Sequence, residues 1–167
     1  NDLGIEINFD HTKYVMHDYQ VAHLTGFIHE QYYDVDTLIT PGFLRFEHTN
    51  GANFLMINFL KKHRFHTSKS NNHVFSLVGK IGGGVVIPKT DVTLFGERLD
   101  NVFHVAGYVT GMEMGLRYEY GKYFFAEGMV KGTYANYTNV LTIGTGRANH
   151  SFYTAEFILS AGVQFPL

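Results

Sequence analysis

Three short polar segments bring together the side chains that are best suited to chemistry. Asp10 precedes His11, Glu47 precedes His48, and Asp91 lies in a third polar segment. A carboxylate fixes the tautomer of a neighbouring imidazole, and imidazole titrates near neutral pH, so this pairing suits general acid–base catalysis. The same groups are ligands for a divalent metal ion, although no His-x-x-x-His spacing is present. The candidate catalytic residues are therefore Asp10, His11, Glu47, His48 and Asp91, and the metal ligands stay undetermined.

The elements that position these residues are predicted to be β-strands, because apolar and polar residues alternate with a period of two. From 106 to 120 the even positions are mainly apolar or aromatic, whereas the odd positions are glycine, valine, glutamate and arginine. The pair Gly121-Lys122 predicts a tight turn, and the alternation resumes from 124 to 134 and from 151 to 167. No segment combines helical periodicity with helix caps.

Eight strands are expected, at 3–10, 19–30, 42–49, 53–63, 73–87, 106–120, 124–134 and 151–167. Several run for about 14 to 18 residues, whereas strands of soluble domains usually have about 5 or 6 and a tilted bilayer-spanning strand about 9 to 11. An open sheet edge in hydrocarbon would leave backbone groups unpaired, so the sheet is expected to close. We therefore predict a single domain over residues 1–167, an all-β, eight-stranded, antiparallel, transmembrane up-and-down β-barrel.

The composition agrees with this prediction and excludes several other classes. The 167 residues suffice for one domain, and the 15 Phe and 11 Tyr suit the aromatic belts of a membrane barrel. A net charge of −2 with scattered basic residues argues against nucleic-acid binding. The absence of cysteine excludes thiol nucleophiles, zinc ribbons and redox motifs. Residues 1–3 lack the basic start and apolar run of a signal peptide, which leaves a cytosolic chain and a processed exported chain both open.

The direction of the strands decides which polar segments meet at one rim. If the C-terminus is periplasmic, the outer loops are 14–18, 50–52, 88–101 and 138–149, and the inner loops are 31–40, 64–72 and 120–122. All candidate catalytic residues then lie at the outer ends of strands, as do four basic residues, Lys13, Lys89, Arg147 and His150. Strict alternation points Asp10 and Glu47 into the lumen but His11 and His48 toward lipid.

Charged residues on the inward face are expected to pair inside the barrel. A barrel of eight strands is only wide enough for side chains to fill, and buried charges need partners. An interior network of salt bridges therefore explains these residues better than a channel or a proton relay. They are Glu6, Lys80, Glu113, Arg117, Glu119, Glu127, Lys131 and Glu156. The glycine-rich segment 79–84 lies within a strand and precedes no helix, so it is expected to allow close packing and not to bind phosphate.

Three segments resemble small outer-membrane barrels related to the rhizobial lipid A oxidase, namely GIEINFDHTK (4–13), FEHTNGAN (46–53) and GGVVIPKTDV (83–92). The resemblance implies activity on the glucosamine head of lipid A, with molecular oxygen as oxidant and a divalent metal as candidate cofactor. It implies that the carboxylates of Asp10, Glu47 and Asp91 ligate metal or act as base, and that His11 and His48 bind metal or move protons. Substrate binding then falls to Lys13, Thr49, Asn50, Lys89, Arg147 and His150.

Three functions stay open from the sequence. The first is an integral protein of the bacterial outer membrane that modifies lipid A or another outer-leaflet lipid at its extracellular rim. The second is a non-enzymatic barrel, either an accessory or anchoring subunit of an outer-membrane complex or an adhesin, whose rim residues only bridge lipopolysaccharide sugars and phosphates. The third is a soluble lipocalin-like lipid binder, which holds its apolar face inside. The expected partners are lipopolysaccharide and, in the second case, other outer-membrane proteins.

Overall fold

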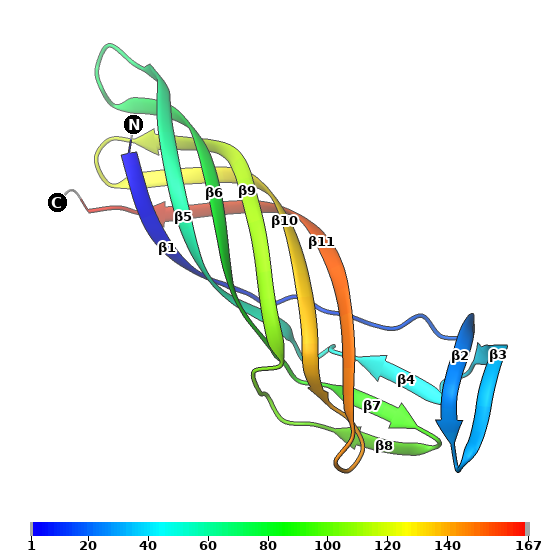
Figure 1. Ribbon diagram of the computed structural model, residues 1–167. Helices are drawn as coiled ribbons and strands as arrows, with labels where there is room; N and C mark the ends of the chain where they lie inside the picture. Colours follow the sequence, from blue (N-terminus) through cyan, green and yellow to red (C-terminus); the bar gives the residue numbers. More distant parts are fainter. Residues whose placement is uncertain (1, 166–167) are drawn as a thin grey trace.

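The computed structural model describes residues 2–165, in which β-strands are joined by turns and loops (Figure 1). Within this range no helix is long and apolar enough to span a membrane. The strands are β1 (Asp2–Asp10), β2 (Gln20–Ile28), β3 (Gln31–Ile39), β4 (Leu44–Glu47), β5 (Ala52–Thr67), β6 (His73–Pro88), β7 (Asp91–Leu94), β8 (Glu97–Asp100), β9 (Gly107–Tyr120), β10 (Phe124–Leu141) and β11 (Arg147–Val163).

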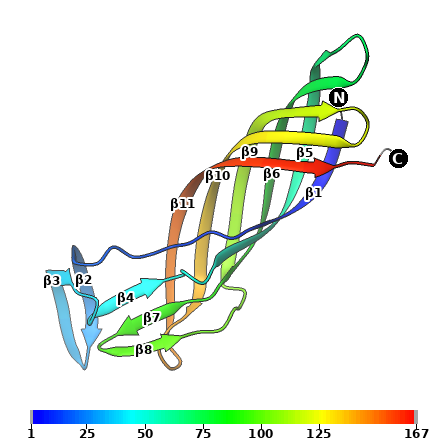
Figure 2. The same cartoon turned by 180° about the vertical axis from the view of Figure 1, so that it is seen from behind.

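Six long strands form one antiparallel sheet in the order β1-β5-β6-β9-β10-β11, which we call the main sheet. Strand β1 starts and β11 finishes at the same end of this sheet, beside the β5–β6 and β9–β10 turns (Figure 1, Figure 2). We call this the proximal end. The opposite, distal end carries the β2–β3 hairpin and a three-stranded sheet in the order β4-β7-β8.

The predicted strand number and barrel closure are wrong. The chain has eleven strands and not eight, and within residues 2–165 β1 and β11 are the two edges of an open sheet. The segments predicted as barrel strands at 19–30 and 42–49 contribute to the smaller sheets, so six strands share the main sheet. The all-β, antiparallel architecture is confirmed, and so is the grouping of the predicted outer loops at one end.

The segment 31–40, predicted as an inner loop, instead forms strand β3 at the distal end and pairs with β2 over nine residues. Asp34 and Asp36 break the apolar alternation of this segment, which made it resemble a loop. Both carboxylates lie 2.9 Å from the imidazole of His23 on β2. Cross-strand pairs of this kind stabilise a sheet and offset the low β-propensity of aspartate.

The short strand β4 pairs with β7, so that Leu44 lies opposite Leu94 and Phe46 opposite Val92. A buried apolar cluster joins this small sheet to the distal end of the main sheet. The cluster includes Phe46, Phe54, Val86, Val92, Val109 and Tyr137. The distal end is therefore a packed structure and not a set of loose loops.

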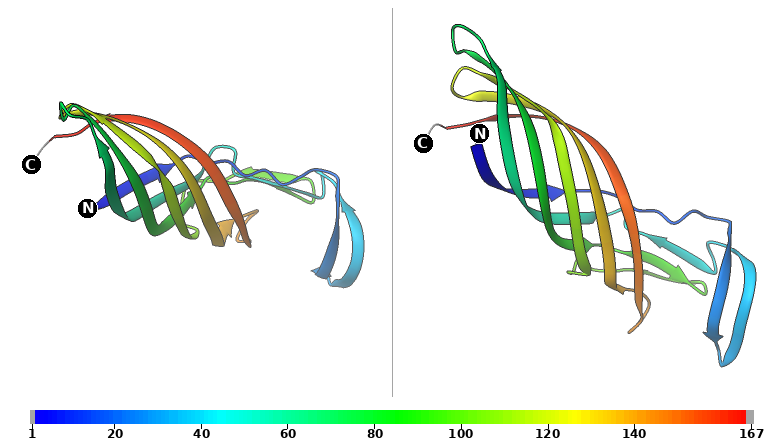
Figure 3. Two further views of the ribbon diagram at one scale, coloured as in Figure 1. Left: turned by 90° about the horizontal axis from the view of Figure 1, so that it is seen from above. Right: turned by 45° about the horizontal axis from the view of Figure 1, so that its top comes forward.

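The two faces of the main sheet differ in chemistry, as the alternation predicts. The convex face is apolar and exposed, with exposed fractions between 55% and 71% for Ile5, Ile57, Met112 and Phe157. The concave face carries the polar and charged side chains, and Figure 3 shows how strongly the sheet curves around it. The segregation of apolar and polar residues is thus the reverse of that in a soluble barrel with an apolar interior.

The concave face holds the predicted network of salt bridges. Lys131 on β10 is only 1% exposed and pairs with Asp10 on the edge strand β1 and with Glu113 on β9, at 3.3 Å from the latter. Lys80 on β6 contacts Glu6 on β1 at 2.7 Å and Glu113 at 3.3 Å. The same network contains Lys62, Arg117, Glu119 and Glu127. The sheet therefore curls until side chains of β1 meet those of β10 across its interior.

The glycine-rich segment of β6 allows close packing against β5, as predicted. A Cβ atom at Gly84 would lie 1.8 Å from the carbonyl oxygen of Leu55, and one at Gly82 would lie 2.0 Å from Oδ1 of Asn58. A Cβ atom at Gly79 would have no neighbour within 4 Å. Glycine is therefore required at two positions of this segment but not at its start.

Candidate functional site

Two histidines from distant parts of the sequence meet at the distal end. His48 follows β4, His150 lies near the start of β11, and their Nε2 atoms are 3.3 Å apart, within hydrogen-bonding distance. Nδ1 of His48 also shares a hydrogen bond of 3.1 Å with the hydroxyl of Thr90. The main-chain N–H of His48 donates to the carbonyl oxygen of Tyr14 at 2.7 Å, which fixes its position. Thr90, His48 and His150 thus form one hydrogen-bonded chain.

Aromatic rings enclose the histidine pair. The ring of Tyr137 stacks on His150 with centroids 4.6 Å apart and an interplanar angle of 8°, and it stacks on His48 at 5.1 Å. Phe46 meets both imidazoles edge-on at 5.1 Å, and Tyr14 lies 5.0 Å from His150. His48 and Tyr137 are fully buried. The pair therefore sits in a rigid and weakly polar environment.

This environment decides the protonation state of His48. The pKa of His48 is lowered to about 3, chiefly because the charged imidazolium would lose its hydration on burial, and to a smaller extent by repulsion from His150 and His104. His48 is therefore neutral at physiological pH. A neutral imidazole has one N–H and one acceptor nitrogen, so only one of the two facing Nε2 atoms donates the hydrogen bond between the histidines.

The outer nitrogen of the pair, Nδ1 of His150, is buried and has no hydrogen-bond partner among residues 2–165. If a neutral His150 donates through Nε2, its Nδ1 is an acceptor; if His48 donates, that Nδ1 carries the proton and is a donor. A buried polar atom without a partner destabilises the protein by about 1–3 kcal/mol. Burial lowers the pKa of His150 to about 4, so its imidazole is neutral at physiological pH. This nitrogen is thus suited to form a hydrogen bond with a polar group of a ligand.

A pocket of about 400 Å³, which we call the distal pocket, lies beside His150. Its apolar wall is formed by Tyr14, Met16, Leu44, Phe46, Val92 and Leu94. Its polar side is formed by the β10–β11 loop and the start of β11, with Thr142, Arg147, Asn149 and His150. An apolar cavity with a few convergent polar groups has the usual character of a small-molecule site. The distal pocket and the histidine pair together are the candidate functional site.

Glu47 and Asp91 lie opposite each other on the paired strands β4 and β7, but neither lines the distal pocket. An arginine neutralises each carboxylate, because Arg45 lies 3.1 Å from Glu47 and Arg98 forms a two-pronged contact with Asp91. The hydrogen bond from Arg98 holds the pKa of Asp91 below its usual value. These two carboxylates stabilise the small sheet and do not reach His48 through a hydrogen bond in the described part of the chain.

Asp10 and His11 also lie away from the histidine pair. Asp10 faces the interior and pairs with Lys131, as its alternation predicts. Nδ1 of His11 shares a hydrogen bond of 2.8 Å with Oδ1 of Asn53. His48, predicted to face lipid, is instead buried, because the strand before it leaves the main sheet and pairs with β7.

The six predicted substrate-binding residues fall into three groups. Arg147 and His150 line the distal pocket. Thr49 donates to Glu47 at 3.4 Å, and Lys89 contacts Asp100 at 2.8 Å, so both take part in the packing of the small sheet. The remaining two residues are exposed at the distal end, namely Lys13 and Asn50.

The donors predicted for a divalent metal do not converge. Among residues 2–165, no group of three or more His, Cys, Asp or Glu side chains could hold a metal ion. The nearest arrangement is the histidine pair, whose further hydrogen-bond partner is the hydroxyl of Thr90. The residues present therefore fit acid–base chemistry and ligand binding better than metal coordination.

Apart from Arg147 and His150, the residues that line the distal pocket were not among the predicted site residues. Around the histidine pair, Tyr14, Thr90 and Tyr137 were missed. Tyr14 and Thr90 stand next to predicted residues, so their place in the polar segments was a usable signal. Tyr137 lies in β10 beyond the part of the strand that alternation predicted, and it pairs with His150 in the strand register. Nothing in the sequence alone indicates that this tyrosine stacks on both histidines.

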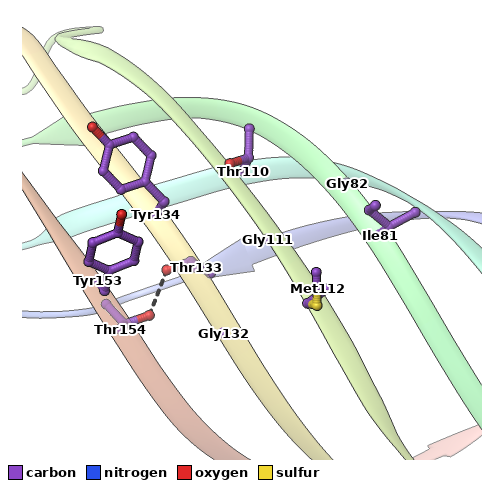
Figure 4. Close-up of a pocket in the computed structure, with 10 residues that line it drawn as sticks. All are labelled: Ile81, Gly82, Thr110, Gly111, Met112, Gly132, Thr133, Tyr134, Tyr153 and Thr154. Carbon is purple, nitrogen blue, oxygen red and sulfur yellow. Dashed lines mark hydrogen bonds between the residues drawn. The ribbon is translucent and has the colours of Figure 1, made fainter.

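A second hollow, of about 520 Å³, lies on the convex face of the main sheet (Figure 4). Gly132 has no side chain on this face, where Met112, Tyr134 and Tyr153 also line the hollow. No acidic, basic or histidine side chain is among the residues that line it. This hollow can accept an apolar chain but offers no group for acid–base chemistry.

No protein-family model, curated protein or solved structure matches this chain.

Proposed function

We propose that the chain is an integral β-barrel protein of a bacterial outer membrane and that its distal end modifies lipid A or another outer-leaflet lipid. The observation that carries this proposal is the apolar, exposed convex face of all six strands of the main sheet. Large contiguous apolar surfaces are rare on soluble monomers and common on proteins that contact a membrane. The alternation of apolar outer and polar inner side chains is that of an outer-membrane barrel.

The placement of tyrosines on β9 supports the membrane proposal. Tyr108 lies near the distal end and Tyr118 near the proximal end, with Met112, Met114 and Leu116 between them on the same face. Ten residues at about 3.3 Å each, tilted by about 40°, span about 25 Å along the membrane normal, which is the height of the apolar band of such barrels. Tyr108 and Tyr118 are thus spaced like the two aromatic belts of a membrane-spanning barrel.

We further propose that the two edges of the main sheet, β1 and β11, are covered when the sheet lies in a membrane. Their unpaired backbone groups would be unsatisfied in hydrocarbon, so both edges need partners there. Because β1 and β11 run in opposite directions, an even number of additional strands would join them with antiparallel pairing throughout.

The distal end supports the lipid-modifying part of the proposal. The histidine pair supplies a buried, neutral hydrogen-bonding group in His150, next to a pocket with an apolar wall and the guanidinium of Arg147. An outer-leaflet lipid presents acyl chains, sugars and phosphates at this level of a membrane barrel. We assign the central role to His48 and His150, in place of the carboxylates Glu47 and Asp91.

Mass spectrometry of lipid A from cells with and without this protein tests the proposal. We expect a mass difference that disappears when His150 is replaced by Phe, which keeps the ring stacking on Tyr137 but removes Nδ1. Arg64→Gln is the control, because Arg64 is exposed at the proximal end and lies outside the distal pocket. Lipid A of identical mass in cells with and without the protein, at equal amounts of folded protein, would contradict the lipid A part of the proposal.

The second candidate function is a non-enzymatic subunit of an outer-membrane complex. It is favoured by the hollow at Gly132 on the convex face, where another protein could dock (Figure 4). Co-purification of one stoichiometric partner, lost when Gly132 is replaced by Trp, would favour this candidate. A soluble lipocalin-like carrier is disfavoured, because the concave face is charged and the apolar face is outside.

A further inference from the structure

We propose that the distal pocket binds a single-chain anionic amphiphile, with its alkyl chain along the apolar wall and its anionic head group at Arg147 and His150. This inference deepens the function proposed above and rests on it for the membrane setting, because it names the class of molecule that the same site takes. The following observations on the two sides of the pocket support it.

The apolar wall is a regular surface made by two paired strands. Leu44 and Phe46 of β4 lie opposite Leu94 and Val92 of β7, and all four side chains line the distal pocket. Met16 extends the wall, because its N–H donates to the carbonyl oxygen of Phe46 at 3.0 Å. A surface of aliphatic side chains in extended strands is long and narrow, which suits an alkyl chain better than a compact polar ligand.

The polar side of the pocket has two groups that can bind an anion. Nη1 of Arg147 donates to the carbonyl oxygens of Thr145 and Gly146, at 3.2 Å and 2.9 Å, and these hydrogen bonds hold the guanidinium at the start of β11. These bonds use one of its three nitrogens, and a guanidinium binds carboxylate or phosphate through two. His150 adds a buried Nδ1 that lacks a partner among the described residues and becomes a donor when His48 donates to its Nε2.

The charges around the pocket favour an anionic ligand over a cationic one. The carboxylates on the neighbouring strands, Glu47 and Asp91, are paired with Arg45 and Arg98 and do not line the pocket. Arg147 is the one charged side chain among the lining residues that the structure describes. A long-chain phosphate or carboxylate therefore matches both the apolar wall and the charge of its polar side.

The test measures binding of dodecyl phosphate, and of neutral dodecanol, to the full chain in discs of zwitterionic phosphatidylcholine. We expect Arg147→Gln to weaken the binding of dodecyl phosphate about tenfold, as expected for one charge-assisted contact, and to leave dodecanol binding unchanged. Leu94→Phe, which fills the pocket, should weaken both ligands. The matched control Arg64→Gln removes the same charge from an exposed position at the proximal end of β5, away from the distal pocket, and should change neither.

Equal binding of dodecyl phosphate by the unaltered protein, Arg147→Gln and Leu94→Phe would overturn the inference, and so would the absence of binding. Folding of each variant is checked by the change in gel mobility on heating. Because the discs contain no lipopolysaccharide, this result is independent of the lipid A experiment. Binding with the expected variant pattern but unchanged lipid A mass would retain the pocket and remove the lipid A modification.

Discussion

At the scale of single residues, the site depends on two imidazoles that are kept neutral. His48 has hydrogen-bond partners on both nitrogens, the hydroxyl of Thr90 and Nε2 of His150. His150 has a partner on one nitrogen only within residues 2–165, which leaves its Nδ1 for a ligand. The surrounding rings of Phe46 and Tyr137 exclude water and fix both imidazole planes. Nδ1 of His150 is therefore the one ring nitrogen of the histidine pair without a hydrogen-bond partner in the described part of the chain.

The lowered pKa of His48 predicts a loss of stability in acid. Its pKa is about 3 in the folded chain against 6.5 when exposed, so below pH 6.5 the unfolded chain binds a proton that the folded chain does not. Stability should thus fall by up to about 1.4 kcal/mol per pH unit between pH 6.5 and pH 3. Urea unfolding in vesicles over this range measures the slope. Burial also lowers the pKa of His150 to about 4, which adds a slope of the same sign. His48→Phe should therefore reduce the slope without abolishing it, and an unchanged slope would contradict the assignment.

Lys131 offers a second test at this scale. Lys131→Met should lower the free energy of unfolding by about 3–5 kcal/mol, because Asp10 and Glu113 would be left without their shared cation in the interior. The control is Lys61→Met on the exposed face of β5, which should cause no loss. Equal stability of both variants in urea unfolding would show that the interior charges are solvated and not paired.

At the scale of the elements, strand periodicity predicted the main sheet well. The long strands β9, β10 and β11 alternate over most of their length, so their existence, relative direction and inward charges could be predicted from the sequence. The short strands could not. β3 carries Asp34 and Asp36, whose pairing with His23 is visible only once the hairpin has formed. β4 lies within the predicted strand 42–49, but its departure from the main sheet was not predicted, and β7 and β8 lie in the segment 88–101 that was predicted as a loop.

The candidate site was only partly predictable for the same reason. His48, Arg147 and His150 were singled out by residue type and by their expected location at strand ends. The contact between His48 and His150 depends on β4 leaving the main sheet, and the pairing of Glu47 with Arg45 removes a carboxylate that looked available. Local sequence indicates which residues are reactive, whereas the tertiary pairing of short strands decides which of them meet.

The glycines of β6 give a prediction for a single element. Gly84→Ala should destabilise the sheet by about 1–3 kcal/mol or prevent folding, because its Cβ would overlap the carbonyl oxygen of Leu55. Gly79→Ala is the matched control on the same strand, where a Cβ meets no atom within 4 Å. The fraction of folded protein after refolding into vesicles measures the difference. Equal folding of both variants would contradict the close approach of β5 and β6.

At the scale of the whole molecule, the account depends on the two faces of the main sheet. The convex face is apolar from β1 to β11, and the concave face is joined across the interior by Lys80, Lys131 and their carboxylate partners. The distal end adds a packed small sheet, the histidine pair and a pocket. Such a molecule has one extended apolar surface and one end with a pocket, which is the arrangement that the proposed function requires.

The most direct measurement of this account is the depth of the convex face in a bilayer. The chain has no cysteine, so a single nitroxide label can be attached at Met114→Cys on the convex face of β9, or at Lys13→Cys at the distal end. We predict that the label at position 114 collides with dissolved oxygen and is protected from a water-soluble nickel complex, whereas the label at position 13 behaves in the opposite way. Equal exposure of both labels to the nickel complex would contradict a membrane-spanning sheet.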